Sequence, residues 1–212
     1  MEIKTKILII CAVLLGLIGY GITAIHFGLE QRTVDLFEAE EIHEGRPYEL
    51  LQEVSAQFSR KTPHLYITKN YFFNAAHIPS STSPLRLRRG KIVISREVID
   101  YFDEQALRGV YAHEISHLIE DPVLNPFFPT RKTLPFEIET DRRAAAYVGF
   151  ETMQATLRAY EELTHLSWWH KHSEHFPSDP SGTWMGDAAF REFRDEIRQR
   201  LDALITAYAK QL

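Results

Sequence analysis

The sequence is poor in cysteine and in positive charge, and each shortage excludes or disfavours a class of structure or function. Its 212 residues contain one cysteine, Cys11, so a disulfide within the chain is excluded. Lys and Arg number 24 against 29 Asp and Glu, which gives a net charge of −5 and argues against a nucleic-acid-binding surface. Internal repeats and low-complexity segments are also absent from the sequence.

One long apolar run stands near the amino terminus. Ile7 to Leu29 spans 23 residues without a charged side chain, long enough as a helix to cross a hydrocarbon core about 30 Å thick. We therefore expect a single-pass anchor in the inner cell membrane, with Lys4 and Lys6 keeping the amino terminus cytoplasmic and the rest periplasmic. A cleaved signal peptide is the alternative, but the run exceeds the usual apolar core of about 7–15 residues.

The remaining residues are sufficient for one compact domain. We expect the polar and acidic residues 30–46 to form a juxtamembrane linker, and residues 47–212 to form one mainly helical α+β domain. A small sheet is expected from a strand at 65–68 and a hairpin at 84–95 that turns at Arg89 and Gly90. Helical patterns cover residues 48–60, the regions around 104–120 and 135–148, residues 152–168 and residues 187–210.

Tyr111 to Glu120 contains the pattern H-E-x-x-H as His113, Glu114 and His117. On a helix, residues four apart lie on one face, so the two imidazoles point toward one location that suits a zinc ion. Glu114 lies beside the first histidine, where its carboxylate can hold and deprotonate a metal-bound water. An accidental match has a chance of roughly a few per cent, and the surrounding helical pattern, with Asp103 as a suitable N-cap, favours the functional interpretation.

A third metal ligand is available in the helical pattern that begins at Pro135. Glu137 and Asp141 are four residues apart and therefore share one helix face. Glu137 would complete a two-His, one-Glu site with the fourth position left for water, and Asp141 could accept the outer N–H of a ligand histidine. The alternative is that the charged residues of this helix form only a solvated face with internal ion pairs.

Several motifs in the same order resemble a known family. Besides those above, they are R-G-K-I-V-I-S, E-I-E-T-D-R-R-A-A and the turn and helix that begin at G-F-E-T-M. They are similar to the zinc metallopeptidases that include the CAAX prenyl proteases, the HtpX heat-shock protease and the Oma-type mitochondrial protease. The resemblance covers Leu65 to Leu163, roughly half of the chain. It implies a zincin-like metallopeptidase domain with one zinc per chain, in which the ligands are His113, His117 and Glu137, the catalytic base is Glu114 and the supporting carboxylate is Asp141.

The resemblance also implies two contacts with substrate. The segment Asn74 to His77 would be an edge strand beside the metal, which makes Asn74 a candidate substrate contact. Relatives carry a His-Pro motif followed six residues later by Arg, whereas here His175 precedes Phe176 and position 181 is Ser. The group that stabilises the oxyanion is therefore unassigned, with His175, Arg191 and Arg194 as candidates. The histidine-rich tract 165–175 could hold a second metal, but ordinary hydrogen-bonded or exposed histidines are favoured.

The sequence thus predicts a membrane-anchored, zinc-dependent metalloendopeptidase that hydrolyses peptide bonds with a zinc-activated water. By analogy with relatives it would act in protein quality control or processing. The expected partners are a protein or peptide substrate and the membrane, without nucleic acid. The rival is a non-catalytic, zinc-stabilised binding module, which is disfavoured because a structural zinc site normally has four protein ligands and no use for Glu114. A zinc hydrolase that acts on another bond stays open.

Overall fold

The computed structural model describes residues 34–35, 38–68, 75–78, 89–120, 133–164 and 187–210. Within them, long helices accompany one small sheet, which confirms the mainly helical α+β class. The elements in chain order are β1 (Ala39–Ile42), α2 (Arg46–Gln57), β2 (His64–Thr68), β3 (Ala75–Ile78), β4 (Lys91–Ser95), α3 (Arg96–Tyr101), α4 (Glu104–Glu120), α5 (Leu134–Val148), α6 (Phe150–Leu163) and α8 (Asp187–Ala209).

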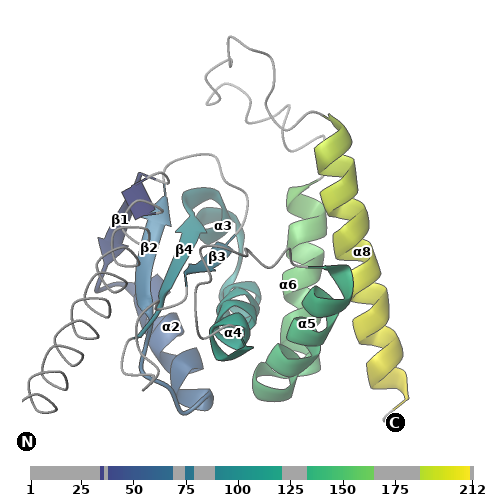
Figure 1. Cartoon of the computed structure of the whole chain (residues 1–212), viewed down its shortest axis with the longest axis horizontal. Coiled ribbons are helices and arrows are strands. Elements are labelled where there is room, and N and C mark those ends of the chain that lie inside the picture. The colour runs from purple at the N-terminus through teal and green to yellow at the C-terminus, as the bar shows by residue number, and fades with distance from the viewer. Residues whose placement is uncertain are drawn as a thin grey trace, which may run out of the picture.

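The sheet is mixed and has the strand order β1-β2-β4-β3. β2 pairs with β4 in parallel, while β1 and β3 pair antiparallel with β2 and β4. β4 therefore has both edges taken, which contradicts the predicted hairpin between its residues and 84–88; that first arm lies outside the described residues. The order leaves β3 at one edge of the sheet, next to α4 (Figure 1).

Helix α4 is the central element of the fold. It packs against α2 and β3 on one side and against α5 and α6 on the other, and Figure 1 shows it between the sheet and the group formed by α5, α6 and α8. Its start is fixed by Asp103, whose Oδ1 accepts the Ala106 N–H at 2.8 Å, as the sequence predicted. Residues from Ala106 to Leu118 are buried with one exception, so α4 is covered on all sides, as expected of a core helix.

A glycine allows α6 to approach α4 closely. A Cβ at Gly109 would collide with the side chain of Thr156 on α6. The Thr156 hydroxyl lies 2.8 Å from the Ala106 carbonyl oxygen and 2.9 Å from that of Thr152, so one side chain joins the two helices. The contact holds α6 against the helix that carries the H-E-x-x-H pattern.

Two boundaries differ from the sequence predictions, and one predicted segment lies outside the described residues. β1 lies within residues 30–46, where a linker was expected, so the folded part of the chain begins earlier. Helix α6 starts at Phe150, directly after Gly149, whose φ of 92° separates it from α5, and not at a Thr152 cap. The apolar run 7–29 lies outside the described residues. Among the helices that are described, none has the length and apolar character needed to span a membrane.

Candidate metal centre

Helix α4 places the two histidines of the H-E-x-x-H pattern side by side. The Nε2 atoms of His113 and His117 are 2.9 Å apart, and their rings are nearly perpendicular, at 88°. His113 is 8% exposed and His117 is fully buried. Because they are one helical turn apart on a buried helix, both side chains reach the same point with little freedom to move away.

Helix α5 brings Glu137 to that point. Its Oε2 lies 3.0 Å from His113 Nε2 and 3.3 Å from His117 Nε2. Pro135 stands in the first turn of α5, where its missing N–H costs nothing, and places Glu137 one turn from the helix start. The structure therefore brings together the three predicted ligands, and the solvated-face alternative does not describe Glu137, which is only 7% exposed.

The three atoms fit the coordination of a zinc ion. A tetrahedral site with nitrogen and oxygen ligands at about 2.0–2.1 Å separates ligand atoms by about 3.3 Å, close to the spacings of 2.9 to 3.3 Å observed here. His113 Nδ1 is 2.8 Å from Asp141 Oδ1, and His117 Nδ1 is 3.5 Å from Thr140 Oγ1. In the neutral tautomer that carries its proton on Nδ1, each Nε2 presents a lone pair toward Glu137, and a cation at that point stabilises this form.

The charges around the cluster favour a cation as well. Burial favours the neutral acid of Glu137, but the two histidines outweigh it and hold the pKa of Glu137 far below its ordinary range. Burial also acts against ionised Asp141, yet Arg200 and His113 lower the pKa of Asp141 to about 2. Burial and Arg200 oppose a charge on His113, but Asp141 and Glu137 raise the pKa of His113 to about 9. Both carboxylates are therefore ionised at neutral pH.

Arg200 of α8 belongs to this centre and was missed in the sequence. Its Nε lies 2.7 Å from Asp141 Oδ2 and its Nη2 lies 2.8 Å from Asp141 Oδ1, a two-point pair that fixes the carboxylate behind His113. Arg200 is 8% exposed. The available signal was an arginine within the apolar stripe of Ile197, Leu201 and Leu204. Arg191 and Arg194, the earlier candidates, do not line the cavity beside the cluster.

His77 on the edge strand β3 is the second residue whose contacts the sequence did not reveal. Its Nδ1 lies 3.2 Å from Glu114 Oε2, and both side chains are almost completely buried. The His77 ring stacks on the His117 ring with centroids 4.6 Å apart, and Phe136 stacks on the His117 ring with centroids 5.4 Å apart. His77, Glu114 and His117 also have metal-binding spacing. Asp141 and Arg200 orient His113 in the other set, which favours His113, His117 and Glu137 as the candidate metal site.

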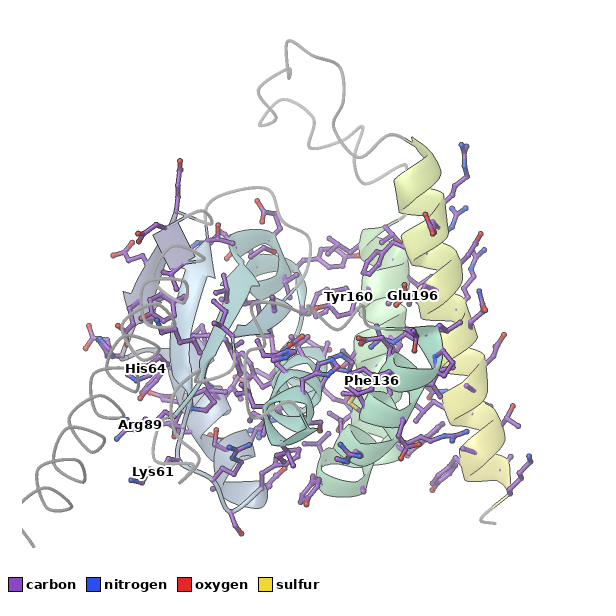
Figure 2. All side chains as sticks on the ribbon, viewed as in Figure 1. Lys61, His64, Arg89, Phe136, Tyr160 and Glu196 are labelled. Atoms are coloured by element: carbon purple, nitrogen blue, oxygen red, sulfur yellow. The ribbon has the colours of Figure 1, made fainter. Side chains whose placement is uncertain are left out.

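A cavity of about 270 Å³ opens beside the cluster. His113, Glu114 and Glu137 line it on the metal side. Tyr160 and Glu196 line it from α6 and α8, and Figure 2 labels both of them together with Phe136. The cavity thus joins the carboxylate of Glu114 to a space that can receive a ligand. The other two predicted contacts, Asn74 and His175, lie outside the described residues.

The site has two histidines one turn apart, a buried glutamate from a second helix and a further glutamate beside the first histidine. This arrangement is typical of metal-dependent hydrolases. The sequence model of peptidase family M48 matches residues 52–129, which confirms the resemblance inferred from the motifs. Over this segment the chain is similar to that family of metallopeptidases. Comparisons with curated proteins and with solved structures gave no match. Glu137 and Asp141 lie beyond the matched segment, so their assignment rests on the geometry above.

Proposed function

We propose that the protein is a zinc-dependent metalloendopeptidase. The observation that carries the proposal is the convergence of His113, His117 and Glu137 on one point, with Asp141 behind His113 and Glu114 at the wall of the same cavity. Three protein ligands leave one coordination position open, which is the pattern of catalytic rather than structural zinc sites. A zinc ion bound there would supply a Lewis acid and a water of lowered pKa.

The residues of the chain supply the proton transfers. Glu114 takes the proton from the attacking water and delivers it to the leaving amine. His77 contacts Glu114 Oε2 and restricts the orientation of that carboxylate. Asp141 holds His113 through Nδ1, so that Nε2 faces the metal position. Each of these groups is almost fully buried, which strengthens its electrostatic interactions.

The position of β3 supports a peptide as substrate. β3 is an edge strand that packs against α4 and carries His77 at the active centre. An extended peptide can add to such an edge through main-chain hydrogen bonds while its side chains enter neighbouring pockets. A substrate peptide bound in this way would pass directly over the cavity beside Glu114.

The apolar run Ile7 to Leu29 supports a further part of the proposal, namely that the peptidase is anchored in the cell membrane with its folded domain on the periplasmic side. In that position it would act on protein substrates in quality control or processing. Digestion of intact spheroplasts with an added protease tests the orientation. A folded domain that stays protected in intact spheroplasts contradicts this topology.

The function is tested by incubating the full-length chain with unfolded casein and measuring its zinc content. We expect one zinc per chain, cleavage that stops after chelation, and a loss of at least about 100-fold in rate for Glu114→Gln with zinc retained. Glu137→Gln should lower the zinc content. Glu151→Gln, an exposed acid on α6, is the matched control and should behave like wild type. Cleavage by Glu114→Gln at the wild-type rate refutes the proposal.

A further inference from the structure

The cavity beside the metal centre contains one acidic side chain that the proposed mechanism does not use. Glu196 lies on α8, one turn before Arg200, and its side chain is 37% exposed. It lines the same cavity as Glu114 and Glu137, and Figure 2 shows it on the part of α8 that faces α6. A substrate that reaches Glu114 therefore also reaches Glu196.

The charges near Glu196 leave room for one more cation. Among the residues that the structure describes, its cationic neighbour is Arg200, but Nη1 of Arg200 is 3.8 Å from Glu196 Oε1, too far for a hydrogen bond. Two closer hydrogen bonds already commit the Arg200 guanidinium to Asp141. A divalent ion at the metal position would offset the charges of Glu137 and Glu114. Among the carboxylates that line the cavity, Glu196 is the one that neither a metal ion at that position nor a short ion pair would neutralise.

The surroundings of Glu196 add to this imbalance. Burial raises the pKa of Glu196 above its ordinary value, and nearby Glu137 and Asp141 act in the same direction, against the opposing effect of Arg200. An approaching cation would relieve the repulsion among these carboxylates. The half-buried position also shields such a contact from solvent more than a surface ion pair.

Part of the remaining cavity wall is apolar and suits a long aliphatic stem, while Thr156 and Arg200 also line the cavity. Met153 and Tyr160 contribute from α6, and Phe193 and Ile197 contribute from α8. The Tyr160 ring is held edge-on against Phe193 with centroids 6.2 Å apart. At about 270 Å³ the cavity accommodates one extended side chain. A side chain with methylene groups and a terminal positive charge matches both parts of the wall.

We propose that this cavity receives a lysine or arginine side chain of the substrate, from a residue that flanks the scissile bond, and that Glu196 pairs with its charge. The proposal rests on the peptidase function proposed above and names its substrate class. Glu196 is then a specificity-determining residue, and the chain cleaves beside basic residues.

The test uses the full-length chain and peptides that are identical except at one position next to the scissile bond, which carries lysine or its neutral isostere norleucine. Mass spectrometry identifies the bond that is cut. We expect wild type to prefer the lysine peptide by about five- to tenfold in kcat/KM. Glu196→Gln should bring this ratio near one, and Glu196→Lys should reverse it in favour of a glutamate peptide. Asp195→Asn, an exposed neighbour on α8, is the matched control and should keep the wild-type ratio.

Binding separates the two proposals. The affinity of Glu114→Gln for the same peptides is measured by fluorescence anisotropy, which needs no turnover. Tighter binding of the lysine peptide that depends on Glu196, in a protein whose wild type cleaves neither peptide, supports the cavity assignment and refutes the peptidase. Cleavage with equal rates for lysine and norleucine, or a preference unchanged in Glu196→Gln, overturns the cavity assignment and leaves the peptidase standing. Preference for norleucine shows an apolar subsite and also overturns it.

Discussion

Replacing Arg200 by Met tests whether α8 is an integral part of the metal centre. The substitution keeps most of the side-chain volume but removes the two hydrogen bonds of 2.7 and 2.8 Å to Asp141. Asp141 is 1% exposed, so its carboxylate would be left buried beside His113 without the guanidinium. Removing one partner of such a buried pair costs about 3–5 kcal/mol, because the charge that remains has lost both water and its partner.

That magnitude is large enough to measure by urea unfolding. With a slope of about 2 kcal/mol per molar urea, the midpoint should fall by about 2 M. Arg198→Met is the matched control on the same helix: its 2.6 Å contact with Glu161 is solvent-exposed, so the loss should stay below about 1 kcal/mol. The double variant Asp141→Asn with Arg200→Met should recover part of the stability, since no buried charge is then left unpaired.

The single variant Arg200→Met should also weaken zinc binding. Asp141 orients His113, and loss of such an outer contact typically costs about 10–100-fold in metal affinity. Competition with a chromophoric chelator measures the affinity of wild type, Arg200→Met and Arg198→Met. If Arg200→Met unfolds at the wild-type midpoint and binds zinc with wild-type affinity, the buried pair does not support the metal centre and the reasoning fails.

Three further predictions concern other contacts of the site. His77→Phe should lower kcat with zinc content unchanged, because the contact with Glu114 Oε2 is lost while stacking is kept; an unchanged kcat contradicts this role. Gly109→Ala should lower the melting temperature, because the added Cβ collides with Thr156; a wild-type transition shows that α6 can shift without cost. In metal-free protein the pKa of Asp141 lies near 2, below its unfolded value. Ionised Asp141 therefore contributes on the order of 2 kcal/mol to the free energy of unfolding above about pH 4, and this contribution is lost as the pH falls toward 2. The stability of Asp141→Asn should lack this dependence on pH.

The sequence was sufficient for features that depend on local spacing. The start of α4 at Asp103, the helix that begins near Pro135 and the strand after Gly90 all follow from periodicity and capping, and the structure has them. The ligands His113 and His117 are fixed relative to each other by one helical turn. Glu137 could be named as a candidate because it shares a helix face with Asp141 in the helical pattern that follows the H-E-x-x-H helix.

Features that depend on pairing between distant segments could not be predicted from local spacing. The sheet order β1-β2-β4-β3 joins strands through contacts that skip along the chain, so the local turn signal at Gly90 led to a hairpin that β4 does not form. Arg200 is 59 residues from Asp141, and His77 is 37 residues from Glu114. An arginine in the apolar stripe of α8 signals a buried partner, but the sequence alone does not say which carboxylate it meets.

The family match and the geometry divide the site in a way that bears on its specificity. The matched segment, residues 52–129, includes α4 with the two histidines and Glu114, together with β3 and its His77. Glu196 and Arg200 come from α8, well beyond that segment, and close the cavity from the other side. Helix α4 therefore carries Glu114 and two of the three candidate ligands, whereas Glu196 lines the cavity from a helix outside the matched segment. If substrate choice resides in Glu196, substitutions at that position should change which peptides are cut while the chemistry of α4 stays the same.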